Sequence, residues 1–350
     1  MSLQKRLVRT IWRPYAMFGG LVWLASMGVG CFKPDDGREP PLDRIYFPTG
    51  LALSPDGDRL YVANSDWDLQ FNAGSVQVYD AARLREQLPT HCESDADCSA
   101  TGGRCDLVPT ADANGVERAP THWCLDAQDD PCGGLGLQTP SQRTTAPGLC
   151  APIENRAPGL LLGSVRVGAF ATDLIYRANP AGGGRLFVPV RSDATLHWMD
   201  VAADGVELDC GQSASGECDA NHRRGDDPGE ASVAGDELPI EPYGIDASED
   251  GTAIVVTHQT EGRVSLFSND WEQPQDGPRL SYILDGLAAT PVLVTAIPVP
   301  EIAKRDRASA RALGYRPGFW VGFRGQPFIQ LLRYFDAVDS PDDVPFIETA

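Results

Sequence analysis

Residues 45–80 form one short antiparallel unit, and the same order of strands and turns recurs three more times along the chain. In this first copy an apolar run at 50–54 leads into a turn at Pro55-Asp56-Gly57, where proline presets φ and glycine permits positive φ. Two further runs, at 59–64 and 74–80, alternate with β-branched and aromatic residues. A period of two between turn residues predicts a meander of antiparallel strands.

Three further copies keep this order, at 163–201, 243–267 and 295–332. In the second copy we expect the run 163–168 to be the opening strand, because it precedes the Thr172–Tyr176 run. In the third, Glu249-Asp250-Gly251 stands where the first copy has its proline-containing turn. The fourth copy contains a charged insert, and the last residues, 344–350, have the pattern of the beginning of another strand.

The first copy resembles the YVTN-type β-propeller repeat, through Tyr61-Val62-Ala63-Asn64 and the following Gly74-Ser75-Val76-Gln77-Val78. The resemblance extends over most of Arg44–Asp336 and implies an all-β chain. Neighbouring blades of such a propeller stack and bury a shared core. Propellers close with about four to eight blades. With four recognisable copies, we expect an incomplete seven-bladed propeller from a longer protein; the alternative is closure through blades too degenerate to recognise.

The N-terminus has the pattern of an export signal. Residues 1–30 contain four basic residues and no acidic one, and an apolar run at 16–29 follows the basic residues. Small residues then precede Cys31, which resembles a lipoprotein cleavage site with the cysteine as lipid acceptor. We therefore expect a lipid-anchored envelope protein, on the outer membrane if the source has two membranes. Soluble export and an uncleaved anchor remain the alternatives.

Eight cysteines remain when Cys31 is set aside, and an even number in an exported chain favours disulfide bonds. Six of them fall within one segment: Cys92, Cys98, Cys105, Cys124, Cys132 and Cys150. Their wide spacings do not match a compact zinc knuckle, and six cysteines allow 15 pairings, so connectivity stays open. Cys210 and Cys218 are far from the others in sequence, and we predict that they bond to each other.

The domain organisation that follows is a signal at 1–30, a linker at 31–43 and a propeller at 44–350. Two inserts interrupt the propeller, a Cys-rich one at 91–150 and an acidic one at 204–238, which we expect to form a disulfide-stabilised cap.

The formal net charge of −20 makes the chain a poor partner for polyanions, so we exclude nucleic acid as a ligand. Acidic turns at Asp112–Glu117 and Asp204–Glu207 could offer oxygen ligands to calcium, but neither has the twelve-residue loop of a strong calcium motif. We interpret both as solvated turns and predict no metal site and no cofactor.

Three side chains are candidates for chemistry: His197, His258 and Asp173, each near a strand end. Some propellers of this kind are lactonases or related hydrolases whose acidic or histidine residues converge on the central channel. None of the three has a sequence neighbour that would give it an acid, base or metal-binding role, so we assign no catalytic residue.

We therefore favour an exported binding or scaffold module, which contacts the membrane through its lipid and an envelope protein or extracellular ligand through its surface. The alternative is a propeller hydrolase or lactonase with its site in the channel. The fold itself is compatible with both functions.

Overall fold

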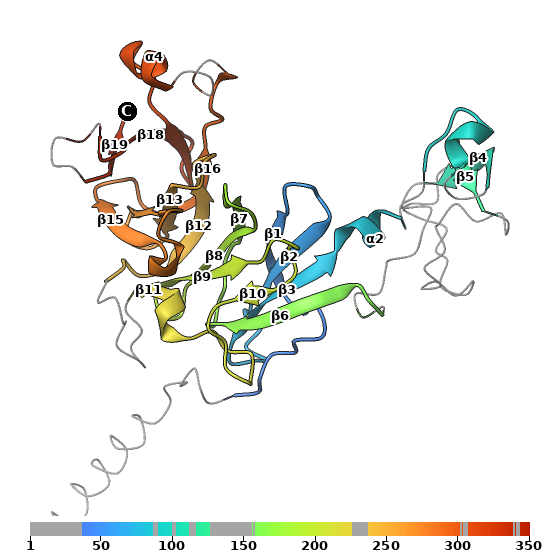
Figure 1. Cartoon of the computed structure of the whole chain (residues 1–350), viewed down its shortest axis with the longest axis horizontal. Helices are drawn as coiled ribbons and strands as arrows, with labels where there is room; N and C mark the ends of the chain where they lie inside the picture. Colours follow the sequence, from blue (N-terminus) through green and yellow to red (C-terminus); the bar gives the residue numbers. More distant parts are fainter. Residues whose placement is uncertain are drawn as a thin grey trace, which may run out of the picture.

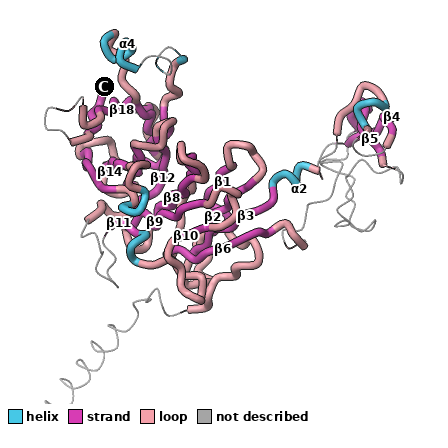
Figure 2. Tube along the Cα trace, in the orientation of Figure 1, coloured by secondary structure: helices cyan, strands magenta, loops and turns pink. Residues whose placement is uncertain are grey.

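The chain is all-β in the computed structural model, and strands far outnumber the few short helices (Figure 2). The structure describes residues 37–86, 90–99, 103–111, 117–126, 156, 158–225, 237–301, 303, 307–338, 340 and 344–350. No helix within these ranges is long and apolar enough to cross a membrane.

Four antiparallel sheets follow one another along the chain (Figure 1). Sheet 1 contains β1 (Pro48–Leu53), β2 (Arg59–Asn64), β3 (Gly74–Asp80) and β6 (Leu161–Val167). Sheet 2 contains β7 (Ile175–Ala178), β8 (Gly184–Val190) and β9 (Thr195–Val201), with β10 (Leu208–Asp209) and β11 (Arg223–Gly225) both paired to β9. Sheet 3 contains β12 (Pro242–Ala247), β13 (Ala253–His258), β14 (Arg263–Ser268) and β15 (Arg279–Leu284). Sheet 4 contains β16 (Pro291–Ala296), β17 (Gly318–Phe323), β18 (Ile329–Phe335) and β19 (Phe346–Thr349).

The remaining elements are short. They are the hairpin β4 (Arg104–Ala111) and β5 (Glu117–Leu125), the helices α2 (Ala81–Arg85) and α4 (Arg307–Ala312), and the 3₁₀ turns η1 (Asp95–Cys98), η3 (Ala220–His222) and η4 (Pro274–Asp276). The sheets, each a meander of neighbouring strands, are blades of a β-propeller-type fold, as the sequence predicted.

The first strands of neighbouring sheets pack together, β1 against β7, β7 against β12 and β12 against β16. The outer strands β6, β15 and β19 lie on the opposite side of their sheets (Figure 1). The four sheets therefore share one inner side lined by their first strands.

One prediction about the repeat was wrong. The run at 163–168 does not open the second sheet; most of it forms β6, which pairs with β3 and places Val165 opposite Val76. The Cys-rich insert thus interrupts sheet 1 itself, between its third and fourth strands. The strand expected near the end of the chain is present: Phe346–Thr349 pairs with β18 as the fourth strand of sheet 4.

The predicted turns at 55–57 and 249–251 form in the same way. In the first, the Ser54 hydroxyl donates to Asp56 at 2.5 Å, and Gly57 has a φ of 74°. In the second, the Ser248 hydroxyl donates to Asp250 at 2.6 Å, and Gly251 has a φ of 68°. Local turn chemistry therefore repeats between sheets 1 and 3.

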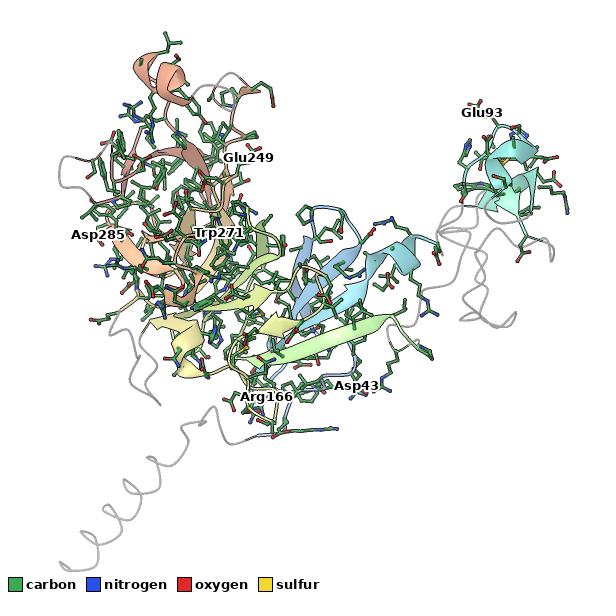
Figure 3. The ribbon with its side chains drawn as sticks, viewed as in Figure 1. Asp43, Glu93, Arg166, Glu249, Trp271 and Asp285 are labelled. Carbon is green, nitrogen blue, oxygen red and sulfur yellow. A yellow bond between two sulfur atoms is a disulfide. The ribbon has the colours of Figure 1, made fainter. Side chains whose placement is uncertain are left out.

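Apolar side chains fill the space between each pair of neighbouring sheets. Tyr61 lies between sheets 1 and 2, where its ring stacks on Tyr176 at 5.3 Å and its hydroxyl donates to the Gly205 carbonyl. Phe187 belongs to the cluster between sheets 2 and 3, and Phe319 to the cluster between sheets 3 and 4. Arg185 is fully buried among the aromatic rings of Trp198 and Trp271; Figure 3 labels Trp271.

The acidic insert is largely part of the fold and not a separate cap. Its Cys210–Cys218 segment packs in the core between sheets 1 and 2, and both cysteines are buried. The Arg166 N–H donates to the Gly216 carbonyl at 2.7 Å, so this segment extends the edge of β6. Asp204–Glu207 forms the tight turn between β9 and β10, in which Asp204 accepts from the Val206 N–H. Residues 226–236 of the insert lie outside the described residues.

Sheet 4 buries one face against sheet 3 and exposes the other. Pairing of Leu293 with Gly322, and of Trp320 with Leu331, places apolar residues of three strands on the outer face. Leu293 is 65% exposed there. Sheet 4 therefore exposes an apolar face, whereas the corresponding faces of sheets 2 and 3 are covered by the next sheet.

Replacing both Cys210 and Cys218 by alanine should lower the free energy of unfolding by about 2–3 kcal/mol, because the bond closes a short loop within the core. Urea denaturation of the two forms measures the loss. Peptide mapping without reductant should recover the two cysteines in one linked pair; free thiols at these positions would contradict the structure.

Candidate functional site

An open pocket of about 430 Å³ lies at one end of the inner strands. It is lined by residues from all four sheets: Phe47, Thr49 and Trp67 beside sheet 1, Arg191 from sheet 2, Tyr243 and Gln259 from sheet 3, and Arg324 from sheet 4. We call this the rim pocket. A pocket to which every sheet contributes is the strongest candidate site in the described part of the chain.

The same backbone hydrogen bond builds the rim in every sheet. The N–H of the residue just after the second strand donates to the carbonyl of a residue that precedes the first strand. The pairs are Ser65 to Phe47 at 2.7 Å, Arg191 to Phe170 at 3.1 Å, Gln259 to Glu241 at 3.0 Å and Arg324 to Thr290 at 2.9 Å. Arg191, Gln259 and Arg324 therefore occupy one repeat position, and all three line the pocket.

Three of the acceptor residues adopt left-handed backbone conformations. Phe170, Glu241 and Thr290 have φ values of 58°, 55° and 65°, although none is glycine. Such conformations cost about 1–3 kcal/mol each and persist only where the surrounding structure enforces them. The rim is therefore a strained and tightly specified part of the backbone, as is common where side chains are held for function.

Arg191 is a fixed wall of the pocket. Its guanidinium forms an ion pair with Glu241 and lies over the ring of Trp67 at 4.9 Å. Partial burial alone would raise the pKa of the Glu241 carboxyl, but the hydrogen bond from Thr260 and the Arg191 charge outweigh it and hold that pKa below its ordinary value. The charge of Arg191 is thus already neutralised.

Arg324 is the available cation. Its side chain is exposed, lies 5.7 Å from the centre of the Tyr243 ring, and donates to the Tyr243 hydroxyl at 3.4 Å. Within the described residues no carboxylate forms an ion pair with it. The pocket therefore contains one neutralised and one accessible guanidinium.

Gln259 contributes an unused acceptor. Its side-chain oxygen is buried and has no hydrogen-bond partner within the described residues. Thr49, by contrast, is engaged, because its hydroxyl donates to the Ala171 carbonyl at 2.9 Å and ties sheet 1 to sheet 2. Gln259 is therefore a polar group that a ligand hydroxyl could satisfy.

Asp173, one of the three sequence candidates, lies next to this rim. It accepts from the Leu174 N–H at 2.8 Å and from the Ile245 N–H at 3.3 Å, which joins sheets 2 and 3. Burial raises the pKa of Asp173 to about 6, in spite of these two backbone donors. The preceding Thr172 donates to the carbonyl of Tyr243 at 2.7 Å, so Asp173 adjoins a pocket residue.

The two candidate histidines are held inside the sheets. His197, in β9, is buried beside Asp193, with Nε2 4.0 Å from the carboxylate. His258, in β13, is buried and contacts the Ser265 hydroxyl at 2.8 Å. Burial lowers the pKa of His258 to about 4, so it is neutral at pH 7. Neither histidine lines the rim pocket.

Within the described part of the Cys-rich insert the cysteines form disulfides. Cys92 bonds to Cys105 and Cys98 to Cys124, which fastens η1 and the segment before it to the β4–β5 hairpin; Figure 3 labels Glu93 in this module. The sulfur atoms of Cys92, Cys98 and Cys124 cluster as metal ligands would, but each belongs to a disulfide. Cys31, Cys132, Cys150 and the Asp112–Val116 part of the calcium candidate lie outside the described residues.

Sequence reasoning missed Arg191 and Arg324. Both are the first residue after an apolar strand, at positions equivalent to each other in the repeat. That shared position was a usable signal, because residues that follow equivalent strands lie at the same end of their sheets. Candidates chosen by their side-chain chemistry alone, such as His197 and His258, lie instead within the strands.

No protein-family model matches the chain, and no curated protein sequence matches it. Solved structures do resemble it. A putative 6-phosphogluconolactonase from Bacteroides uniformis is 13% identical over 91% of this chain and 61% of its own, with a TM-score of 0.42. A periplasmic gluconolactonase from Pseudomonas aeruginosa is 14% identical over 87% of this chain and 72% of its own, with a TM-score of 0.31.

An auxiliary nutrient binding protein from Bacteroides thetaiotaomicron is 11% identical over 87% of this chain and 57% of its own, with a TM-score of 0.31. The chain thus spans less than two thirds of the length of the Bacteroides uniformis protein. Identities and TM-scores in this range assign neither an activity nor a ligand.

The raised pKa of Asp173 predicts a pH-dependent stability. Because its folded-state pKa of about 6 exceeds the ordinary 3.8, the folded protein binds this proton more tightly than the unfolded chain. The contribution of Asp173 to stability is therefore greatest below pH 4 and is lost as the pH rises to 6. The Asp173→Asn variant should lack this pH dependence. The difference in free energy of unfolding, variant minus native, should therefore increase by up to about 3 kcal/mol as the pH rises from 4 to 6.

Chemical denaturation at several pH values between 4 and 7 measures this difference. Asp285→Asn provides a surface control, since the Asp285 side chain is 65% exposed; Figure 3 labels it on the β15 side of the molecule. A stability difference for Asp173→Asn that does not change between pH 4 and 6 would contradict the assigned pKa.

Proposed function

We propose that this chain is an exported, lipid-anchored binding module of the cell envelope, with its ligand site in the rim pocket. The observation that carries the proposal is the composition of that pocket. Four sheets bring together guanidinium groups, aromatic faces and an amide, which are groups that recognise ligands. Arg191 is held in place by Glu241 and Trp67, which gives the pocket a preorganised wall.

The location rests on the N-terminal pattern and on the disulfides. Cys31 stays the expected lipid acceptor, after the basic and apolar segments of residues 1–30. Buried disulfides such as Cys210–Cys218 are suited to an oxidising compartment. Both features support a protein that acts outside the cytoplasm, where a lipid would hold it at a membrane and leave the sheets accessible to a ligand or an envelope partner.

A hydrolase acting on lactones or esters is the second candidate, and Asp173 favours it. A carboxyl group with a pKa of about 6 is suited to general acid or base chemistry near neutral pH, and it adjoins the rim pocket through Thr172 and Tyr243. Against this role, both Asp173 oxygens already accept backbone N–H bonds, one from the adjacent Leu174 and one from Ile245, which joins sheet 2 to sheet 3. We therefore place the binding function first.

The anchor can be tested directly. Mass spectrometry of membrane-extracted protein should find Cys31 at the mature N-terminus with acyl chains attached, because lipoprotein processing cleaves before the cysteine. A Cys31→Ala variant should leave the membrane fraction. An unmodified peptide that spans Gly30-Cys31 as the dominant species would refute lipidation.

The choice between binding and hydrolysis can be tested with a panel of lactones and esters. The native protein should show no turnover above that of a heat-denatured sample, and neither should Asp173→Asn, His197→Ala or His258→Ala. Turnover by the native protein that disappears in Asp173→Asn, with the protein still folded by circular dichroism, would favour the hydrolase. Turnover that instead depends on a histidine would refute both the binding proposal and the role given to Asp173.

A further inference from the structure

We propose that the rim pocket selects a ligand with a single carboxylate on a hydroxylated ring, and that Arg324 is the residue that recognises the charge. This inference rests on the proposed binding function and names the ligand class. It follows from three properties of the pocket, namely its one accessible cation, its aromatic faces and its unused amide acceptor.

The two arginines differ in whether their charge is already paired. Arg191 already pairs with Glu241, so an incoming anion would have to compete with a carboxylate that is held by Thr260 as well. Arg324 has the Tyr243 hydroxyl as its side-chain partner, and that contact leaves most of its donors available. A guanidinium binds a carboxylate through two parallel hydrogen bonds, so one accessible arginine accommodates one carboxylate.

Larger charges fit poorly. A phosphate monoester carries about −1.5 to −2 at neutral pH, which one guanidinium would neutralise only in part. The chain has a net charge of −20, so a polyanion would be repelled by the rest of the surface. A monoanion gains the local contact with Arg324 and has the smallest long-range penalty.

The walls of the pocket favour a ring. Trp67 and Tyr243 contribute aromatic faces, and both already stack with guanidinium groups, which fixes their orientation. Phe47 adds a third apolar surface on the sheet 1 side. A pocket of about 430 Å³ admits a molecule of one or two rings, whose flat or C–H face would lie on these side chains.

Gln259 adds the requirement for a hydroxyl. Its buried side-chain oxygen has no donor in the described part of the protein, and a buried acceptor without a partner is costly. A ring hydroxyl on the ligand would satisfy it. Sugar acids and hydroxylated aromatic acids share this chemistry, and direct binding measurements can separate them.

Isothermal titration calorimetry of the oxidised, full chain provides the test, with D-glucuronate and 4-hydroxybenzoate as the acidic probes. D-glucose and 4-hydroxybenzyl alcohol are the matched neutral probes. At least one acid should bind, about 10- to 100-fold more tightly than its neutral counterpart, since charged hydrogen bonds make the difference. The affinity should fall as salt is added, because Arg324 is exposed.

Three variants assign the contacts. Arg324→Gln should weaken the acid by about 10- to 100-fold and leave the neutral probe unchanged. Arg333→Gln is the matched control, because Arg333 is also an exposed arginine of sheet 4 but pairs with Glu348 and does not line the pocket. Gln259→Leu should weaken the hydroxylated acid and have a smaller effect on benzoate, which lacks the hydroxyl.

The outcomes separate this inference from the broader proposal. Equal binding of acid and neutral probes, or equal effects of Arg324→Gln and Arg333→Gln, would overturn the carboxylate assignment and leave a binding module in place. Failure of both acids to bind would overturn the inference as well. Turnover of a lactone or ester would instead overturn the proposed function itself.

Discussion

The packing of each sheet against its neighbours is the constraint on which the rest of the structure depends. All seven residues of β8 and all six of β13 are buried, so these second strands have apolar neighbours on both faces. In the sequence, a strand covered on both faces is a nearly continuous run of apolar residues, without the alternation of apolar and polar residues of a half-exposed strand. Sheets 2 and 3 therefore form only as members of a stack, since neither could cover its own faces alone.

Stacking also determines the geometry of the site. Hydrogen bonds between inner strands, such as Thr49 to Ala171 and Thr172 to Tyr243, fix each sheet relative to the next. Asp246 continues this series by accepting from the Ala296 N–H across the sheet 3–sheet 4 boundary. With the inner strands fixed, the residues that follow the second strands have defined positions at one end. The rim pocket is therefore a consequence of the packing, and its walls need no separate scaffold.

Local features of the fold were predictable from the sequence, and long-range pairing was not. The turns at Gly57 and Gly251 follow from serine, aspartate and glycine within four residues. The strands at 59–64 and 253–258 follow from their apolar and β-branched runs. The assignment of 161–167 to sheet 1 depends instead on its pairing with β3, across the whole Cys-rich insert. An alternating strand has the same pattern whether it opens one sheet or closes another.

The candidate site illustrates the same limit. His258 has the side chain of an acid–base residue, but its strand position places it between sheets, where burial lowers its pKa to about 4. Arg324 looks like an ordinary surface arginine in the sequence, and only the arrangement of four sheets brings it to Tyr243 and Gln259. Proximity in space, and not the type of residue, therefore separates a pocket-lining group from a packing group in this chain.

The repeat also separates what the backbone builds at the rim from what the side chains add. At the position after the second strand the backbone N–H makes the same contact in all four sheets, as in Arg191 to Phe170. The side chains there differ in burial, from Ser65, which is fully buried, to Arg324, which is exposed. Serine, arginine, glutamine and arginine occupy this position in sheets 1 to 4. Because this hydrogen bond uses only backbone atoms, it is compatible with different side chains at the same position. The chemical groups at the rim are thus set by side chains that the repeated backbone contact does not itself specify.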